Sequence, residues 1–217
     1  MKNVVACILA LSIFGASWIS LSAFAPQLQA VTKTPVAREM SVVASTAASG
    51  REPGESREPL KLPLSEPRIE VWKAKRQLLL FSAGRVVRTY RIGLGLSPLG
   101  DKVREGDHRT PEGDFYIFTK NPHSTYYLSL GISYPNLVHA RRGLRDGLIT
   151  QAQYDRIYAA LKEKRGPPQN TPLGGLIYIH GNGARTDWTW GCVALENEEV
   201  KELYQAVEVG TRVSIKP

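Results

Sequence analysis

The sequence predicts a mainly β domain of the α+β class over residues 68–217, with a sandwich-like architecture and two helices, one of them in an insertion. Two observations support this fold class. Most of the segments are short runs of alternating apolar and polar residues, separated by turn-forming residues. Only two segments carry apolar residues at helical spacing. A β-rich sandwich is the simplest architecture for a count dominated by strands.

An apolar segment precedes this domain. Residues 4–25 are uncharged and mostly apolar, which is typical of a secretory leader. The small residues of Ala23-Phe24-Ala25 suit cleavage, but Pro26 is a poor start for a mature chain, so a cut near Ala30 is an alternative. The run is also long enough to stay in place as an uncleaved anchor. We therefore expect residues 1–30 to form a signal peptide or an N-terminal membrane anchor.

A linker and a basic charge balance follow from composition. Residues 31–67 are rich in Ala, Ser, Thr, Pro, Arg and Glu without an apolar period, which predicts a disordered linker. The formal net charge of +8 suits anionic partners such as membrane surfaces or acidic cell-wall polymers, and it equally suits a solvated basic surface. The arginines are scattered and no zinc-finger or aromatic RNA-binding signature is present, which argues against a nucleic-acid-binding protein.

The strands are expected from alternation and from short apolar runs. The turn at residues 82–85 reverses the chain and predicts an antiparallel meander at the start of the domain. The Gly-rich residues 93–100 lack the Lys-Ser/Thr ending of a phosphate-binding loop, so we expect a loop over the active-site face. The expected strands are 69–73, 77–81, 86–94, 114–119, 126–134, 176–179, 193–195 and 211–215.

Two helices are expected. Thr150 and Gln153 match a capping box, and a helix with apolar residues at helical spacing follows and stops at Gly166-Pro167-Pro168. We expect this inserted helix to pack over the sheet and to narrow the cleft. Asn197 is a candidate cap for a second helix over residues 198–207.

Two other polar segments are candidates for function. His108 lies before the Thr110-Pro111-Glu112-Gly113 turn and is interpreted as a surface residue, with substrate contact as the alternative. His139, with Arg141, Arg142 and Arg145, precedes the inserted helix. We interpret this cluster as a solvated loop, with an anion pocket as the alternative.

The chemistry is concentrated between two apolar runs. His180 ends the first run, and Cys192 begins the second after a Gly/Asn/Asp loop. If the two strands bring thiol and imidazole within hydrogen-bond reach, His180 can take the thiol proton and leave a nucleophilic thiolate. Cys7 lies in the leader, so Cys192 is the only thiol of the exported chain, and no internal disulfide can form. A small buried core residue is the alternative interpretation of a single cysteine.

These residues carry a family resemblance. The turn Thr110–Gly113, the strand end at His180-Gly181 and the segment Asp187-Trp188-Thr189-Trp190-Gly191-Cys192-Val193 together resemble the L,D-transpeptidase catalytic domain, the YkuD-like family. The resemblance implies that Cys192 is the nucleophile, that His180 is the base and later the acid, and that Thr189 is the hydroxyl residue of the Ser/Thr-x-Gly-Cys signature. The backbone amides around Gly191 and Cys192 are candidate donors to an oxyanion.

The same resemblance implies a secreted enzyme of the bacterial cell envelope or periplasm that acts on peptidoglycan stem peptides without a metal or an organic cofactor. Two positions depart from the pattern. Trp190 replaces the histidine that commonly precedes Gly-Cys, and Ala194 replaces an arginine that is common two residues after the cysteine. Three functions stay open: a transpeptidase that cross-links stems, an L,D-carboxypeptidase or hydrolase of the same substrate, and a non-catalytic module that binds the wall.

Overall fold

The eight strands form a single curled, mixed sheet in the computed structural model, which describes residues 58–217. The predicted leader and most of the predicted linker lie outside these residues. Within them, the elements are β1 (Arg68–Trp72), β2 (Gln77–Ser82), β3 (Arg85–Arg91), β4 (Gly113–Ser124), β5 (Tyr127–Ile132), α1 (Leu137–Arg145), α2 (Gln151–Lys162), β6 (Tyr178–His180), β7 (Val193–Ala194), α3 (Asn197–Ala206) and β8 (Arg212–Lys216).

The sheet order is β3-β2-β1-β8-β4-β5-β6-β7, with the last strand near its middle. The predicted antiparallel meander is confirmed for β1, β2 and β3. Strand β8 pairs in parallel with β1 and antiparallel with β4, so it joins the two halves of the sheet. At the far edge β6 and β7 are parallel neighbours, which carries the two segments with the expected catalytic residues side by side.

The core lies inside the curl of this sheet and beneath α3. The alternating burial of the strands places one side chain in two in this core, as the period of a strand requires. Val200 and Leu203 of α3 complete the cluster from the other side. Leu60 and Leu64, which the sequence placed in the linker, also pack against it, so the folded part of the chain extends to the N-terminal side of Arg68.

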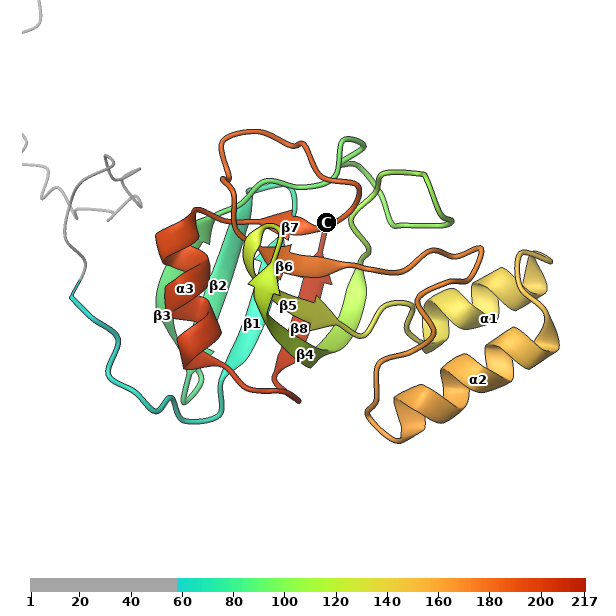
Figure 1. Cartoon of the computed structure of the whole chain (residues 1–217), viewed down its shortest axis with the longest axis horizontal. Coiled ribbons are helices and arrows are strands. Elements are labelled where there is room, and N and C mark those ends of the chain that lie inside the picture. Colours follow the sequence, from blue (N-terminus) through green and yellow to red (C-terminus); the bar gives the residue numbers. More distant parts are fainter. Residues whose placement is uncertain (1–57) are drawn as a thin grey trace, which may run out of the picture. The chain divides into compact units, whose positions relative to one another are not determined.

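The insertion between β5 and β6 contains two helices rather than the single one that the sequence predicted. Helix α1 begins at the cap Asn136, and α2 begins at the predicted capping box of Thr150 and Gln153. The two helices lie side by side, on the side of the sheet away from α3 (Figure 1). They share a small core of their own, formed by Ala140, Ile149, Ile157 and Leu173. The expectation that α2 packs over the sheet is therefore wrong, because its apolar face is covered by α1.

Helix α3 also begins differently from the prediction. Glu196 is its cap and offers no side-chain hydrogen bond to the first turn. The side chain of Asn197 instead accepts a hydrogen bond from the Asn182 N–H at 2.8 Å, which fixes the loop after β6. None of the helices in residues 58–217 has the length and apolar character needed to cross a bilayer.

Candidate active site

The Cys192 sulfur lies against the start of β6. Sγ accepts a hydrogen bond from the Tyr178 N–H at 3.4 Å and donates one to the Leu176 carbonyl oxygen, also at 3.4 Å. Burial raises the pKa of the thiol to about 11, although the Tyr178 N–H and the charge of Lys102 oppose this shift. The Cys192 side chain is therefore a neutral thiol at neutral pH.

The His180 ring is buried between two aromatic side chains. Its ring is stacked on Tyr126 with a centroid separation of 4.7 Å, and Trp188 contacts it edge-on at 5.5 Å. Nδ1 lies 2.8 Å from the Gly181 carbonyl oxygen, which can only accept, so Nδ1 carries the proton and Nε2 is free to accept one. Burial lowers the pKa of His180 more than this hydrogen bond raises it, so the ring is neutral at neutral pH.

Cys192 and His180 lie on one face of the sheet. They are on neighbouring strands, and their positions along the strands differ by two residues. The parallel register pairs Ile179 with Val193 and His180 with Ala194, so Cys192 continues the register beside Tyr178. Side chains two positions apart on a strand share a face, which puts the thiol and the imidazole on the same side. In the described part of the chain, the hydrogen bonds of the sulfur go to backbone atoms. The direct thiol–imidazole hydrogen bond that the sequence suggested is not formed in this resting state.

The turn before Cys192 is held by Thr189. Its hydroxyl donates to the Cys192 carbonyl oxygen at 2.8 Å and accepts from the Gly191 N–H at 3.1 Å. Gly191 has a φ of +127°, and a Cβ there would lie 2.7 Å from the Arg109 carbonyl oxygen, so only glycine fits. Because the Gly191 amide is engaged by Thr189, it would have to change partner in order to bind an oxyanion.

The two positions that depart from the signature have distinct environments. Trp190 is 77% exposed and stacks on His108, with ring centroids 5.7 Å apart. Ala194 is fully buried in β7 and bridges to Gly93, a place without access to solvent for an arginine side chain. His108, which was predicted to be a surface residue, is thus half-buried beside the turn before Cys192. It packs against Trp190, the residue that departs from the family signature.

Segments far apart in the sequence contact the residues around the turn that precedes Cys192. Gly93 and Gly95 form bridges to Ala194 and Thr189, so the Gly-rich loop lies against the segment that contains Cys192. Asp187 accepts hydrogen bonds from the Leu94 N–H at 2.9 Å and from the Arg76 guanidinium at 2.7 Å. Asp187 therefore has a structural role, because its hydrogen bonds join the Gly-rich loop to the turn between β1 and β2.

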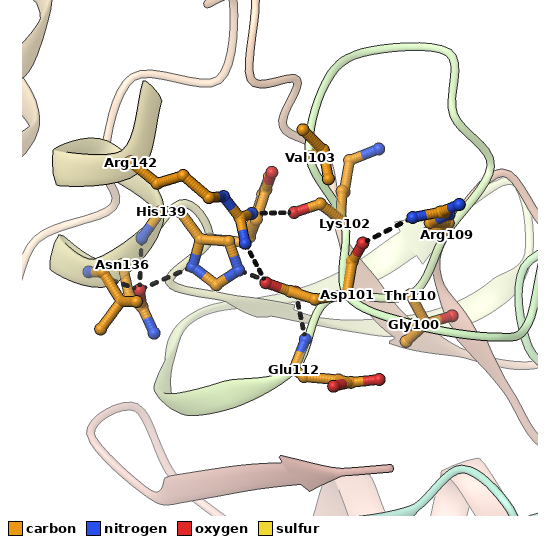
Figure 2. A network of polar contacts seen from close by, with 12 residues as sticks. Gly100, Asp101, Lys102, Val103, Arg109, Thr110, Glu112, Asn136, His139 and Arg142 are labelled. Carbon is orange, nitrogen blue, oxygen red and sulfur yellow. Dashed lines mark hydrogen bonds and ion pairs between the residues drawn. The ribbon is translucent and has the colours of Figure 1, made fainter. Parts of the chain in front are cut away.

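His139 is buried and charged, in contrast to the solvated loop that the sequence suggested. The residue is 1% exposed, and its ring lies between Asn136 and Asp101 (Figure 2). Nδ1 lies 2.6 Å from the Asn136 side-chain oxygen, which accepts two helix N–H groups and is therefore the carbonyl oxygen. Nε2 lies 3.0 Å from Asp101 Oδ1. Both ring nitrogens face acceptors, so both carry protons and the ring is an imidazolium.

Asp101 is the centre of this cluster. It accepts hydrogen bonds from Arg142 at 2.7 Å and from the Glu112 N–H at 2.8 Å (Figure 2). Partial burial alone would raise the pKa of Asp101, but the hydrogen bonds and charges of His139, Glu112 and Arg142 outweigh it and hold the pKa far below its usual value. The cluster ties the loop before β4 to helix α1. His139 and Arg142 do not form an open anion pocket, because the carboxylate of Asp101 already occupies the place of an anion between them.

The comparison with protein families decides the relationship of the chain. A family model described as the L,D-transpeptidase catalytic domain, YkuD, matches residues 66–215. The chain belongs to this family. The L,D-transpeptidase domains of the family are cysteine-dependent and act on peptidoglycan stem peptides.

Relatives of this L,D-transpeptidase domain are distant. A protein of Escherichia coli K12, YafK, whose name carries a provisional L,D-transpeptidase assignment, is 27% identical over 146 residues, which cover 64% of this chain and 46% of the relative. The helical cell shape determining protein Pgp2 of Campylobacter jejuni (K307A mutant) is 24% identical, with a TM-score of 0.47 and coverage of 70% and 47%. An L,D-transpeptidase of Xylanimonas cellulosilytica is 19% identical, with a TM-score of 0.42 and coverage of 74% and 65%. The chain spans about half the length of the curated relative.

The sequence missed several contacts of this site. Tyr126 reaches His180 from the β4–β5 turn, and Lys102 acts on the thiol from the loop before β4. Neither belongs to a local motif, and only the fold brings them close. Trp188 lay within the quoted motif, where its spacing gave no sign of contact with the imidazole.

Proposed function

We propose that this chain is a cysteine-dependent L,D-transpeptidase of peptidoglycan, with Cys192 as the nucleophile and His180 as the base. The observation that carries the proposal is the His180 tautomer. The Gly181 carbonyl fixes the proton on Nδ1, so that Nε2 can accept the thiol proton from the neighbouring strand. A neutral thiol beside a neutral base requires the proton transfer to accompany attack.

The acylation step follows from these roles. Sγ attacks the carbonyl carbon of an L-residue in the stem, and a C–S bond forms while its proton passes to His180 Nε2. The C–N bond to the terminal D-residue then breaks, and His180 returns the proton to the departing amine. A thioester on Cys192 remains. Of the two candidate donors to the oxyanion, the Cys192 N–H is the one that remains, since the Gly191 N–H donates to Thr189.

The second step sets the product. An amine of a neighbouring stem attacks the thioester carbon, loses a proton to His180, and releases the thiol, which gives a cross-link. If water attacks in its place, the same residues perform an L,D-carboxypeptidase reaction. The proposed site of action is the cell envelope, and residues 4–25 are the proposed export signal or tether.

Mass spectrometry of the reaction products tests the proposal. The full chain is incubated with tetrapeptide stems, and dimers linked through the diamino acid are expected beside the released D-residue. If tripeptide forms without dimers, the transferase assignment is overturned and the hydrolase assignment takes its place. Binding without turnover, equal in the chain and in Cys192→Ala, would overturn both and point to a wall-binding module.

A covalent probe tests the roles of the two residues. A carbapenem should add to the Cys192 peptide of the full chain, and Cys7→Ala should label equally. His180→Gln should slow this labelling by more than about a hundredfold, because a base is lost. His123→Gln is the matched control, since His123 is exposed on β4. Equal labelling of the two histidine variants would contradict the role of His180.

A further inference from the structure

A pocket of about 750 Å³ lies beside the catalytic imidazole. Tyr126 and Trp188 line it, and the same two rings contact His180. The pocket is therefore one aromatic side chain away from the proposed base. Its remaining lining comes from the loop after β6 and from the residues that begin α3, including Arg185 and Glu196.

The frame of this pocket is already held by hydrogen bonds. The Asn182 N–H donates to Asn197, the Ala184 N–H donates to Glu196 Oε1 at 3.1 Å, and the Trp188 indole N–H donates to the Gly183 carbonyl oxygen at 3.1 Å. These bonds satisfy the backbone of the loop, so the pocket is pre-formed. They use only one of the two carboxylate oxygens of Glu196.

Two opposite charges remain available in the lining. Within residues 58–217, Arg185 and Glu196 form no ion pair with each other or with another side chain, and both are exposed. A guanidinium recognises a carboxylate, and a carboxylate oxygen recognises an ammonium group. Tyr126 and Trp188 give the lining apolar ring surface, which suits an aliphatic chain. A simple anion is disfavoured by Glu196, and a simple cation is disfavoured by Arg185.

We propose that this pocket binds the distal α-amino-acid centre of a diamino acid in a peptidoglycan stem, which carries an ammonium and a carboxylate at the end of an aliphatic chain. Arg185 binds the carboxylate, Glu196 binds the ammonium, and the two aromatic rings pack on the chain. The proposal rests on the proposed function for its substrate class. It assigns to these residues the discrimination between a diamino acid with a distal carboxylate and one without it.

Equilibrium binding to the full chain with Cys192→Ala tests this assignment without turnover. Three stems are compared that differ only at the distal centre: diaminopimelate with a free carboxylate, its carboxamide, and lysine, which lacks the group. The free carboxylate should bind about tenfold more tightly than the other two. Arg185→Gln should remove this difference and leave the lysine stem unchanged. Glu196→Gln, which keeps an oxygen for Ala184, should weaken all three stems.

Arg145→Gln is the matched control, because Arg145 is an exposed arginine of α1. Equal affinity of the three stems, or an equal loss for all three in Arg185→Gln, would overturn the assignment. Discrimination in binding without any turnover by the unaltered chain would overturn the proposed reaction and leave the pocket standing. Turnover without discrimination among the three stems would overturn the assignment of the pocket and leave the proposed reaction standing.

The pocket holds the distal centre of the donor stem, because an amine held by Glu196 as an ammonium has no lone pair with which to attack the thioester on Cys192. Release of the terminal D-residue from a donor stem alone should therefore be slower for Arg185→Gln. An unchanged release would contradict a role of the pocket in acylation.

Discussion

The Cys192 thiol is partly buried, and its reactivity should show the effect of this burial directly. Its pKa of about 11 predicts that alkylation by iodoacetamide rises about tenfold per pH unit from pH 7 to 10 and levels off near 11. Mass spectrometry of the Cys192 peptide in the Cys7→Ala chain measures the rate. A plateau near pH 8.5 would contradict the burial effect.

The same shift affects stability in alkali. Folding raises the thiol pKa from its ordinary value of 9.0, so the folded state favours the protonated form. The contribution to stability is present below pH 9 and is lost as the pH rises through about 11. Chemical denaturation measures the free energy of unfolding of the chain and of Cys192→Ala from pH 9 to 11. The difference between the two should become smaller as the pH rises.

Gly191 is a second residue whose backbone decides the site. Gly191→Ala should lower the free energy of unfolding by about 2–4 kcal/mol and abolish labelling, because its Cβ meets the Arg109 carbonyl oxygen at an unfavourable φ. Gly106→Ala is the matched control. Gly106 also has a positive φ, of +75°, but a Cβ there would meet nothing within 4 Å. Urea denaturation should separate the two variants, and equal losses would show that the close contact is unimportant.

The candidate catalytic residues could be named from the sequence because they lie in one continuous motif, and their roles stay a prediction. His180 and Cys192 are twelve positions apart, at the ends of two short strands. Tyr126, Lys102 and the charged state of His139 could not be predicted. Each depends on contacts between segments that only the folded sheet brings together.

At the scale of elements, the Asp101 cluster joins α1 to the loop before β4. Asp101→Asn should destabilise the fold by more than about 2 kcal/mol at pH 7, because the imidazolium and Arg142 lose their counter-charge in a largely buried place. Chemical denaturation measures the loss. Arg145→Gln tests the exposed ion pair with Asp146 and should cost less than about 1 kcal/mol.

The pH dependence of this effect has a definite sign. The pKa of Asp101 is lower in the folded state, so its stabilisation is complete above its ordinary value of 3.8 and is lost as the pH falls below it. The gap between the chain and Asp101→Asn should stay constant from pH 5 to 7 and narrow progressively below pH 4. A gap that widened on acidification would contradict an ionised Asp101.

Most strands and two helices could be predicted from their local patterns. Helix α1 was missed because its three arginines suggested a solvated loop. Asn136 directly before Leu137 is the capping signal that could have revealed it. The pairing of β8 with β1 could not be predicted, since the residues that pair are more than 140 positions apart and no turn connects them.

At the scale of the whole molecule, the segment before β1 is part of the fold. A chain that begins at residue 68 should be about 1–3 kcal/mol less stable than one that begins at residue 58, because Leu60 and Leu64 no longer cover the core. Urea denaturation of the two chains measures the difference. Leu60→Ala with Leu64→Ala in the longer chain should reproduce most of it, and an unchanged midpoint would show that this packing is unimportant.

The position of β8 also determines when the domain can complete its fold during synthesis. Because β8 separates β1 from β4, the sheet remains in two halves until residue 216 has left the ribosome. A nascent chain that still lacks this strand has two unpaired edges and an open core, which makes it a good substrate for chaperones. Ribosome-stalled chains that end before and after β8 should therefore differ sharply in resistance to protease.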